Sequence, residues 1–135
     1  MGVVTLSIHD LEGGCLAFDL RDILRLLAPL SLKAIWTVTS EEEAFEATGE
    51  GGMRLEDLAK TSAKIDGDDL LAIADSTQQV IWGDFMGVLP DHPHRVWLTI
   101  RAIDSSFYEI TSSDEASLAR IKSSFRDVRI VSTAT

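Results

Sequence analysis

The sequence contains a single cysteine, Cys15, among its 135 residues. No disulfide can form within the chain, which is typical of proteins kept in a reducing compartment. Apolar runs are short as well, far below the roughly 20 residues that cross a bilayer, and the first residues lack the basic and apolar segments of a signal peptide. These absences predict a cytoplasmic protein.

Basic residues are also scarce: there are 12 Lys and Arg against 22 Asp and Glu, and the net charge is −10. The excess is concentrated, because residues 41–100 hold 13 acidic and 4 basic residues, a net charge of −9. Such a surface repels polyanions, so we expect neither a nucleic-acid nor a membrane partner. A basic protein is the partner that this charge favours.

The motifs of the common cofactor and nucleotide sites are absent. The sequence has no GxxxxGK[ST], GxGxxG, HExxH, CxxC or GxSxG pattern. We therefore predict no cofactor. No internal repeat and no linker divides the chain, and its length and 45% hydrophobic content predict one globular domain over residues 1–135.

Alternating apolar residues and β-branched side chains predict several strands, at residues 3–8, 33–39, 79–89, 96–103, 107–111 and 127–131. Residues 79–89 are apolar on both faces apart from Asp84, which predicts a central strand covered on both sides. Gly83 and Gly87 in this strand predict a bulge or the close approach of another group to the backbone. We expect residues 132–135 to form a loose tail.

Helical spacing of apolar residues predicts helices at residues 19–28, 54–63, 67–75 and 113–125. Asp19 and Asp66 are suitable N-caps, Pro29 ends the first helix, and Ser112 with Glu115 forms a capping box before the last. A strand is an alternative for residues 67–75, and 41–52 is expected to be a loop. Short turns between strands indicate an α+β fold with a mainly antiparallel sheet and helices packed on it.

Two features favour a binding function. The run of Glu41, Glu42, Glu43 and Glu46 surrounds Phe45, so it could steer a basic partner and anchor it on one aromatic ring, although a solvated loop would have the same composition. Trp97 alternates with arginines along its strand, which predicts partial exposure and a binding hot spot, unless a helix covers it.

The sequence therefore predicts a non-catalytic acidic domain that binds a basic protein, as an inhibitor, an immunity-type protein or an adaptor does. Self-association to a homodimer is compatible with this function.

An alternative function centres on Asp84, an acid among apolar neighbours. It could pair with Arg95 or Arg101, reach solvent at a bulge, or act as a general acid or base with a raised pKa. In the last case a histidine of the following turn, His92 or His94, would complete the site of a small enzyme or ligand-binding domain.

Two further positions are weaker candidates. Asp91, His92 and His94 are residue types that ligate metals, but they are equally typical of an exposed turn, and we predict no metal site. Cys15 is expected to be a small buried hydrophobic residue rather than a nucleophile.

Overall fold

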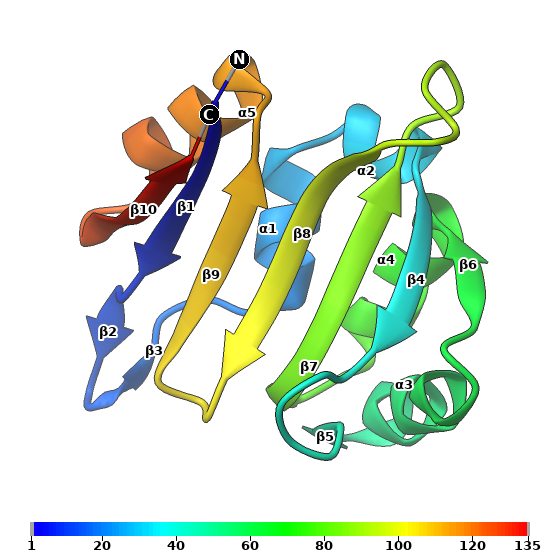
Figure 1. Ribbon diagram of the computed structural model, residues 1–135. Coiled ribbons are helices and arrows are strands. Elements are labelled where there is room, and N and C mark those ends of the chain that lie inside the picture. The colour runs from blue at the N-terminus through cyan, green and yellow to red at the C-terminus, as the bar shows by residue number, and fades with distance from the viewer. Residues whose placement is uncertain (1, 135) are drawn as a thin grey trace.

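The computed structural model describes residues 2–134 and contains one large antiparallel sheet (Figure 1). Its strand order is β10-β1-β9-β8-β7-β4-β6, and β5 pairs with β7 beside this path. A separate hairpin joins β2 to β3. The strands are β1 (Val3–Ile8), β2 (Leu11–Glu12), β3 (Cys15–Leu16), β4 (Ile35–Thr39), β5 (Glu46–Thr48), β6 (Lys64–Asp66), β7 (Gln79–Val88), β8 (Val96–Ile103), β9 (Phe107–Ser112) and β10 (Val128–Ala134).

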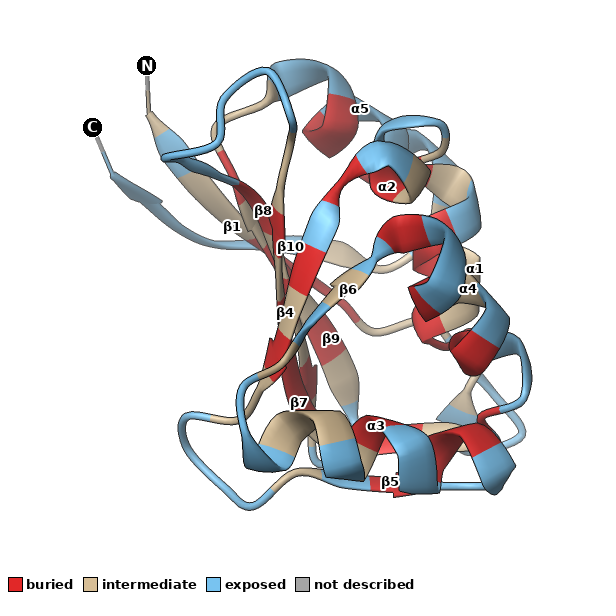
Figure 2. Ribbon diagram, turned by 90° about the vertical axis from the view of Figure 1, so that its right-hand side faces the viewer, coloured by how far each residue is buried: buried red, intermediate tan, exposed pale blue. Residues whose placement is uncertain are grey.

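The helices all pack on one face of this sheet (Figure 2). They are α1 (Leu20–Leu26), α2 (Leu30–Lys33), α3 (Glu50–Lys60), α4 (Gly67–Asp75) and α5 (Glu115–Ser124). The α+β class and the antiparallel sheet are confirmed. The expectation that the central strand is covered on both sides is wrong, because no helix lies on the opposite face in the described part of the chain. No helix there is long and apolar enough to cross a membrane.

The two glycines of β7 do receive close neighbours, as predicted. A Cβ atom on Gly83 would lie 2.4 Å from Cε2 of Phe45, and one on Gly87 would lie 2.9 Å from the ring of Trp36. Trp36 is fully buried and donates its indole N–H to the carbonyl of Ser31 at 2.8 Å. Only glycine leaves room for an aromatic ring against the backbone at these positions.

Helix α3 begins four residues before its predicted start, and its first turn contains Gly51 and Gly52. Glycine is unfavourable inside a helix, which is why the sequence indicated a loop there. The packing explains the exception: a Cβ on Gly51 would lie 2.2 Å from the carbonyl oxygen of Ile73, and one on Gly52 would lie 2.8 Å from the carbonyl carbon of Ala47. The helix can approach α4 and β5 only without side chains at these positions.

The other helix ends follow the sequence more closely. Asp19 caps α1 and forms a capping box with Asp22, and residues 67–75 are helical. The last helix is capped by Asp114 instead of Ser112, because the Asp114 carboxylate accepts the N–H of Ser117 while the Ser112 hydroxyl bonds to the carbonyl of Trp97. The short helix α2 after Pro29 was not predicted.

The end of the chain is a strand, so the prediction of a loose tail is wrong for residues 132–134; Thr135 lies outside the described residues. Strand β10 pairs antiparallel with β1 from Val3 opposite Ala134 to Ile8 opposite Val128. Its β-branched residues could indicate a strand, but the sequence gives no partner for it. That partner is β1, more than 100 residues away along the chain.

Candidate functional site

The acidic segment forms a loop at the end of the sheet where β7 begins (Figure 1). It leaves β4 after Thr39, carries Glu41, Glu42 and Glu43 on the surface, and enters β5 at Glu46. The Ser40 hydroxyl donates a hydrogen bond to the carbonyl of Glu43, which closes a turn around the first acids. All four glutamates are exposed, as a binding loop requires.

Asp84 holds this loop in place from the neighbouring strand. The residue is 5% exposed, and its Oδ2 accepts the backbone N–H of Glu41 at 3.2 Å. Its Oδ1 accepts Nε–H of Arg101 at 3.2 Å, because β7 and β8 place these two residues opposite each other. The structure therefore contains the ion pair with Arg101 that was one of the three interpretations of Asp84.

Arg101 is the cation shared by this cluster. Its guanidinium lies 3.6 Å from Oε2 of Glu41 and 3.9 Å from Oε1 of Glu109, besides its contact with Asp84. Burial raises the pKa of the Asp84 carboxyl, and Arg101 opposes that rise by favouring the charged form. Three carboxylates around one guanidinium leave the cluster with an excess of negative charge.

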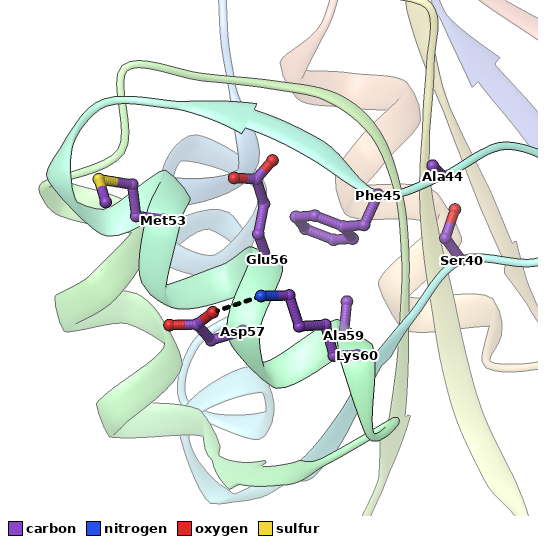
Figure 3. Close-up of a pocket in the computed structure, with 8 residues that line it drawn as sticks. All are labelled: Ser40, Ala44, Phe45, Met53, Glu56, Asp57, Ala59 and Lys60. Atoms are coloured by element: carbon purple, nitrogen blue, oxygen red, sulfur yellow. Dashed lines mark hydrogen bonds and ion pairs between the residues drawn. The ribbon is translucent and has the colours of Figure 1, made fainter.

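Phe45 connects the loop to the hydrophobic core. Its ring lies against Gly83 and meets the ring of Phe85 edge to face, with centroids 5.9 Å apart. A hollow of about 530 Å³ opens between the loop and α3, where Phe45 points toward the helix (Figure 3). The hollow is lined by Ser40, Ala44, Phe45, Met53, Glu56, Asp57, Ala59 and Lys60.

The hollow has an apolar floor, and Glu56, Asp57 and Lys60 supply the charges at its rim. Met53 is 68% exposed, which is high for so large an apolar side chain, and it stands on the same helix as Glu56. The Lys60 ammonium pairs with Asp57 at 3.1 Å, so these two charges offset each other and Glu56 is the remaining charged side chain that lines the hollow. An aliphatic side chain that ends in a positive charge fits both the floor and the rim.

Trp97 does not belong to this surface, and its predicted exposure is wrong. It is 7% exposed and contacts Trp36, with ring centroids 5.9 Å apart. The cause is a β-bulge: Gly87 pairs with Leu98 and Val88 pairs with Val96, so Trp97 has no partner on β7. The extra residue breaks the alternation and turns the indole toward the core.

The histidine turn lies apart from Asp84. Residues 90–95 connect β7 and β8 at the opposite end of the sheet from the acidic loop, about 20 Å along the strand from Asp84 at the usual rise per residue. Asp91, His92 and His94 are exposed there. Among the described residues, no group of three His, Cys, Asp or Glu is arranged to hold a metal ion.

Cys15 is exposed at the start of β3, directly after the turn of the β2–β3 hairpin, so the expectation of burial is wrong. The preceding Gly13 and Gly14 both have positive φ and form a tight turn that carries the thiol outward.

A second buried carboxylate belongs to Asp19, which the sequence indicated only as a helix N-cap. Its Oδ1 accepts the N–H of Leu20 at 2.9 Å and the hydroxyl of the fully buried Tyr108. Burial raises the pKa of Asp19 above its usual value, and burial together with the Asp19 charge raises the pKa of Tyr108. These bonds join α1 to β9, so this pair has a structural role.

Met53 and Glu56 were missed because they lie in a helix, not in the acidic run. Their spacing of three residues on α3 is the signal that places them on one face.

No family model, no curated protein and no solved structure matches this chain.

Proposed function

We propose that this chain is a non-catalytic, acidic protein-binding domain that captures a basic segment of another protein at the hollow between residues 40–46 and α3. The observation that carries the proposal is the fixed loop. Asp84 and Arg101 hold Glu41 by its backbone and its side chain, while Phe45 is anchored on Gly83. A surface that is ordered before binding loses less conformational entropy when its partner arrives.

The charges around the hollow support a cationic partner. Glu41, Glu42, Glu43 and Glu46 lie on the loop, and Glu56 lines the hollow from the helix. Carboxylates gathered on one side of a protein attract a basic molecule from a distance and speed its association. The exposed apolar side chain of Met53 would then contact the aliphatic stem or apolar neighbour of the bound cation.

In this proposal Asp84 is a positioning residue, not a general acid or base. Both of its oxygens are occupied, one by the Glu41 amide and the other by Arg101. An inhibitor, an immunity-type protein and an adaptor all use surfaces of this kind. The exposed thiol of Cys15 supports a reducing compartment such as the cytoplasm as its location.

The first test is a pull-down with the tagged chain from a lysate of the source cell at low and moderate salt. We expect a stoichiometric basic protein that dissociates as the salt concentration rises. A direct test then measures association of a lysine-rich peptide carrying one leucine by stopped-flow anisotropy. This peptide supplies the two chemistries of the hollow.

The matched variants change the same charge at two places. Glu42, Glu43 and Glu46 are replaced by Gln in one protein, and the exposed Asp66, Asp68 and Asp69 near the start of α4 are replaced by Asn in the control. Glu41 is left unchanged because it contacts Arg101. We expect the loop variant to slow association by roughly tenfold at low salt and the control by much less. Equal slowing in both variants would show that total charge, and not this site, attracts the peptide.

A second variant separates the apolar contact from the charge. Met53→Gln removes apolar area without changing the charge, so it should weaken binding of the leucine-containing peptide and leave a peptide of lysine and glycine alone unaffected. If neither peptide distinguishes Met53→Gln from the unchanged protein, the hollow is not the binding site.

A further inference from the structure

The two edges of the sheet differ in a way that the binding site does not explain. The edge formed by β6 is three residues long, contains the charged residues Lys64 and Asp66, and continues directly into α4. Short, charged edge strands are a common means of preventing pairing with another molecule. The opposite edge, formed by β10, is seven residues long and contains one charged residue, Arg129. Its pairing with β1 is interrupted only by a β-bulge that leaves Val131 without a partner.

Strand β10 is well exposed, and four of its seven residues are apolar. Each residue from Arg129 to Ala134 is exposed, with Ile130 at 63% and Val131 at 52%. Val3, opposite Ala134 on β1, is 43% exposed as well. Three of the eight large hydrophobic side chains exposed in the described chain therefore lie on the two strands at this edge.

The strand is held firmly at its start, so it presents an ordered edge. The carboxylate of Asp10 accepts the backbone N–H groups of Arg126 and Asp127, the latter at 2.7 Å. The N–H of His9 donates to the carbonyl of Asp127 at 2.8 Å. Because the strand is already ordered, pairing with another strand does not have to order it first.

The charge distribution favours a second copy of the chain at this edge. Arg129 is the only charged residue in β10, and it pairs with Asp127 through two contacts of 3.0 Å. Residues 112–135 hold three acidic and four basic residues, and β1 contains no charged residue. The acidic part of the chain, around β4, β5 and α3, lies toward the opposite edge of the sheet, near β6.

We propose that two copies of this chain form a dimer by antiparallel pairing of β10 with β10 across a twofold axis, which makes one continuous sheet. An antiparallel edge is complementary to its own copy, since each strand presents the same groups in reverse order. This arrangement joins the acid-poor ends and keeps the two acidic regions as far apart as the sheet allows. The hollow at residues 40–46 stays open in both copies.

The dimer is expected to be weak. Pairing along one strand edge buries less than the roughly 1,200 Å² of standard interfaces, so self-association should be visible at roughly tens to hundreds of micromolar protein. Sedimentation equilibrium is the measurement. The expected result is a species of twice the 14.8 kDa chain mass at high concentration. A monomer at every concentration up to the solubility limit would overturn the proposal.

Substitutions at the edge locate the interface. Val131→Lys and Ile130→Lys add a charge to exposed positions, and each should raise the dimer dissociation constant by about tenfold or more. Leu11→Lys, at a position 61% exposed on the separate hairpin, is the matched control and should leave it unchanged. Thermal unfolding of the variants establishes that they are folded. Equal dimerisation of Val131→Lys and Leu11→Lys would contradict the pairing of β10.

The strand pairing itself is tested by single cysteines at positions 129 to 133 in a Cys15→Ser background. Oxidation should give a disulfide-linked dimer whose yield has a sharp maximum at the residue nearest the twofold axis, whereas uniform yields at all five positions would show random collision.

Raising the salt concentration should strengthen the dimer, because it screens repulsion between two chains of net charge −10. Binding of a basic partner should weaken under the same change, so a failure of one proposal does not imply failure of the other.

Discussion

The Asp84 carboxylate accepts the backbone N–H of Glu41 at 3.2 Å, which ties a buried acid in a strand to the first acid of the exposed loop. The sequence indicated these two residues as parts of competing functions. The structure instead places them in one unit, where the buried carboxylate fixes the position of the exposed ones. Arg101 completes the unit by contacting both side chains.

Replacing Arg101 by Gln should destabilise the protein in a pH-dependent way. Burial raises the pKa of Asp84 in the folded protein above its usual value of 3.8. The carboxyl therefore contributes its full stabilisation below pH 3.8, where it is protonated, and this contribution is lost as the pH rises through the folded-state pKa. Arg101 limits this loss. Without it, the pKa rises further, and we expect the variant to lose about 1–3 kcal/mol at pH 7 and less near pH 4.

The measurement is urea unfolding of both proteins across this pH range. The double variant Asp84→Asn with Arg101→Gln serves as the control, since it has no buried charge to neutralise and should recover part of the stability at pH 7. A loss in Arg101→Gln that is constant with pH would mean that the arginine acts through packing and not through the Asp84 charge.

Gly83→Ala should loosen the acidic loop. The new Cβ would lie 2.4 Å from Cε2 of Phe45, so the ring must leave its place on β7. Gly87→Ala is the matched control, because it crowds Trp36 on the same strand and face without touching the loop. We expect each to cost about 1–3 kcal/mol in the free energy of unfolding.

Only Gly83→Ala should speed amide hydrogen exchange in residues 41–46 and weaken binding of the lysine-rich peptide. Comparable effects of both glycine substitutions on the loop would show that general destabilisation is responsible, and that Phe45 does not anchor it.

Asp19 allows a separate test of a buried carboxylate. Asp19→Leu removes the helix cap and leaves the Tyr108 hydroxyl without its acceptor, at an expected cost of about 2–4 kcal/mol. Asp19→Asn keeps an oxygen for both donors and should cost less. Because burial raises the pKa of Asp19, the natural protein loses stability as the pH rises through that pKa, whereas the Asn variant does not.

The stability of Asp19→Asn relative to the natural protein should therefore improve between pH 4 and pH 7, as measured by chemical unfolding. A relative stability that declines over this range would contradict the assigned effect of burial.

Local patterns in the sequence predicted the fold class well, because period and capping are local properties. The spans of β7, β8 and β9 and the cap of α1 at Asp19 follow from alternation and from residue type. The first turn of α3 could not be predicted in this way. Its glycines are unfavourable for a helix and are required only by contacts with β5 and α4, which are distant in the chain.

The candidate site was partly predictable for the same reason. The acidic run and Phe45 are adjacent in the sequence, and Asp84 is conspicuous as an acid in an apolar strand. The exposure of Trp97 was misjudged because a β-bulge shifts the strand by one residue, and strict alternation then assigns the wrong face. Met53 and Glu56 join the site through the packing of α3, which no local pattern specifies.

The position of β1 has a consequence for synthesis of the protein. Its neighbours in the sheet are β9 and β10, so during synthesis β1 must wait for about 100 further residues before it can pair on either side. At ordinary translation rates this interval lasts roughly ten seconds. Throughout it, the side chains of Leu6 and Ile8, which are fully buried in the folded protein, have no sheet to enter and stay exposed to solvent.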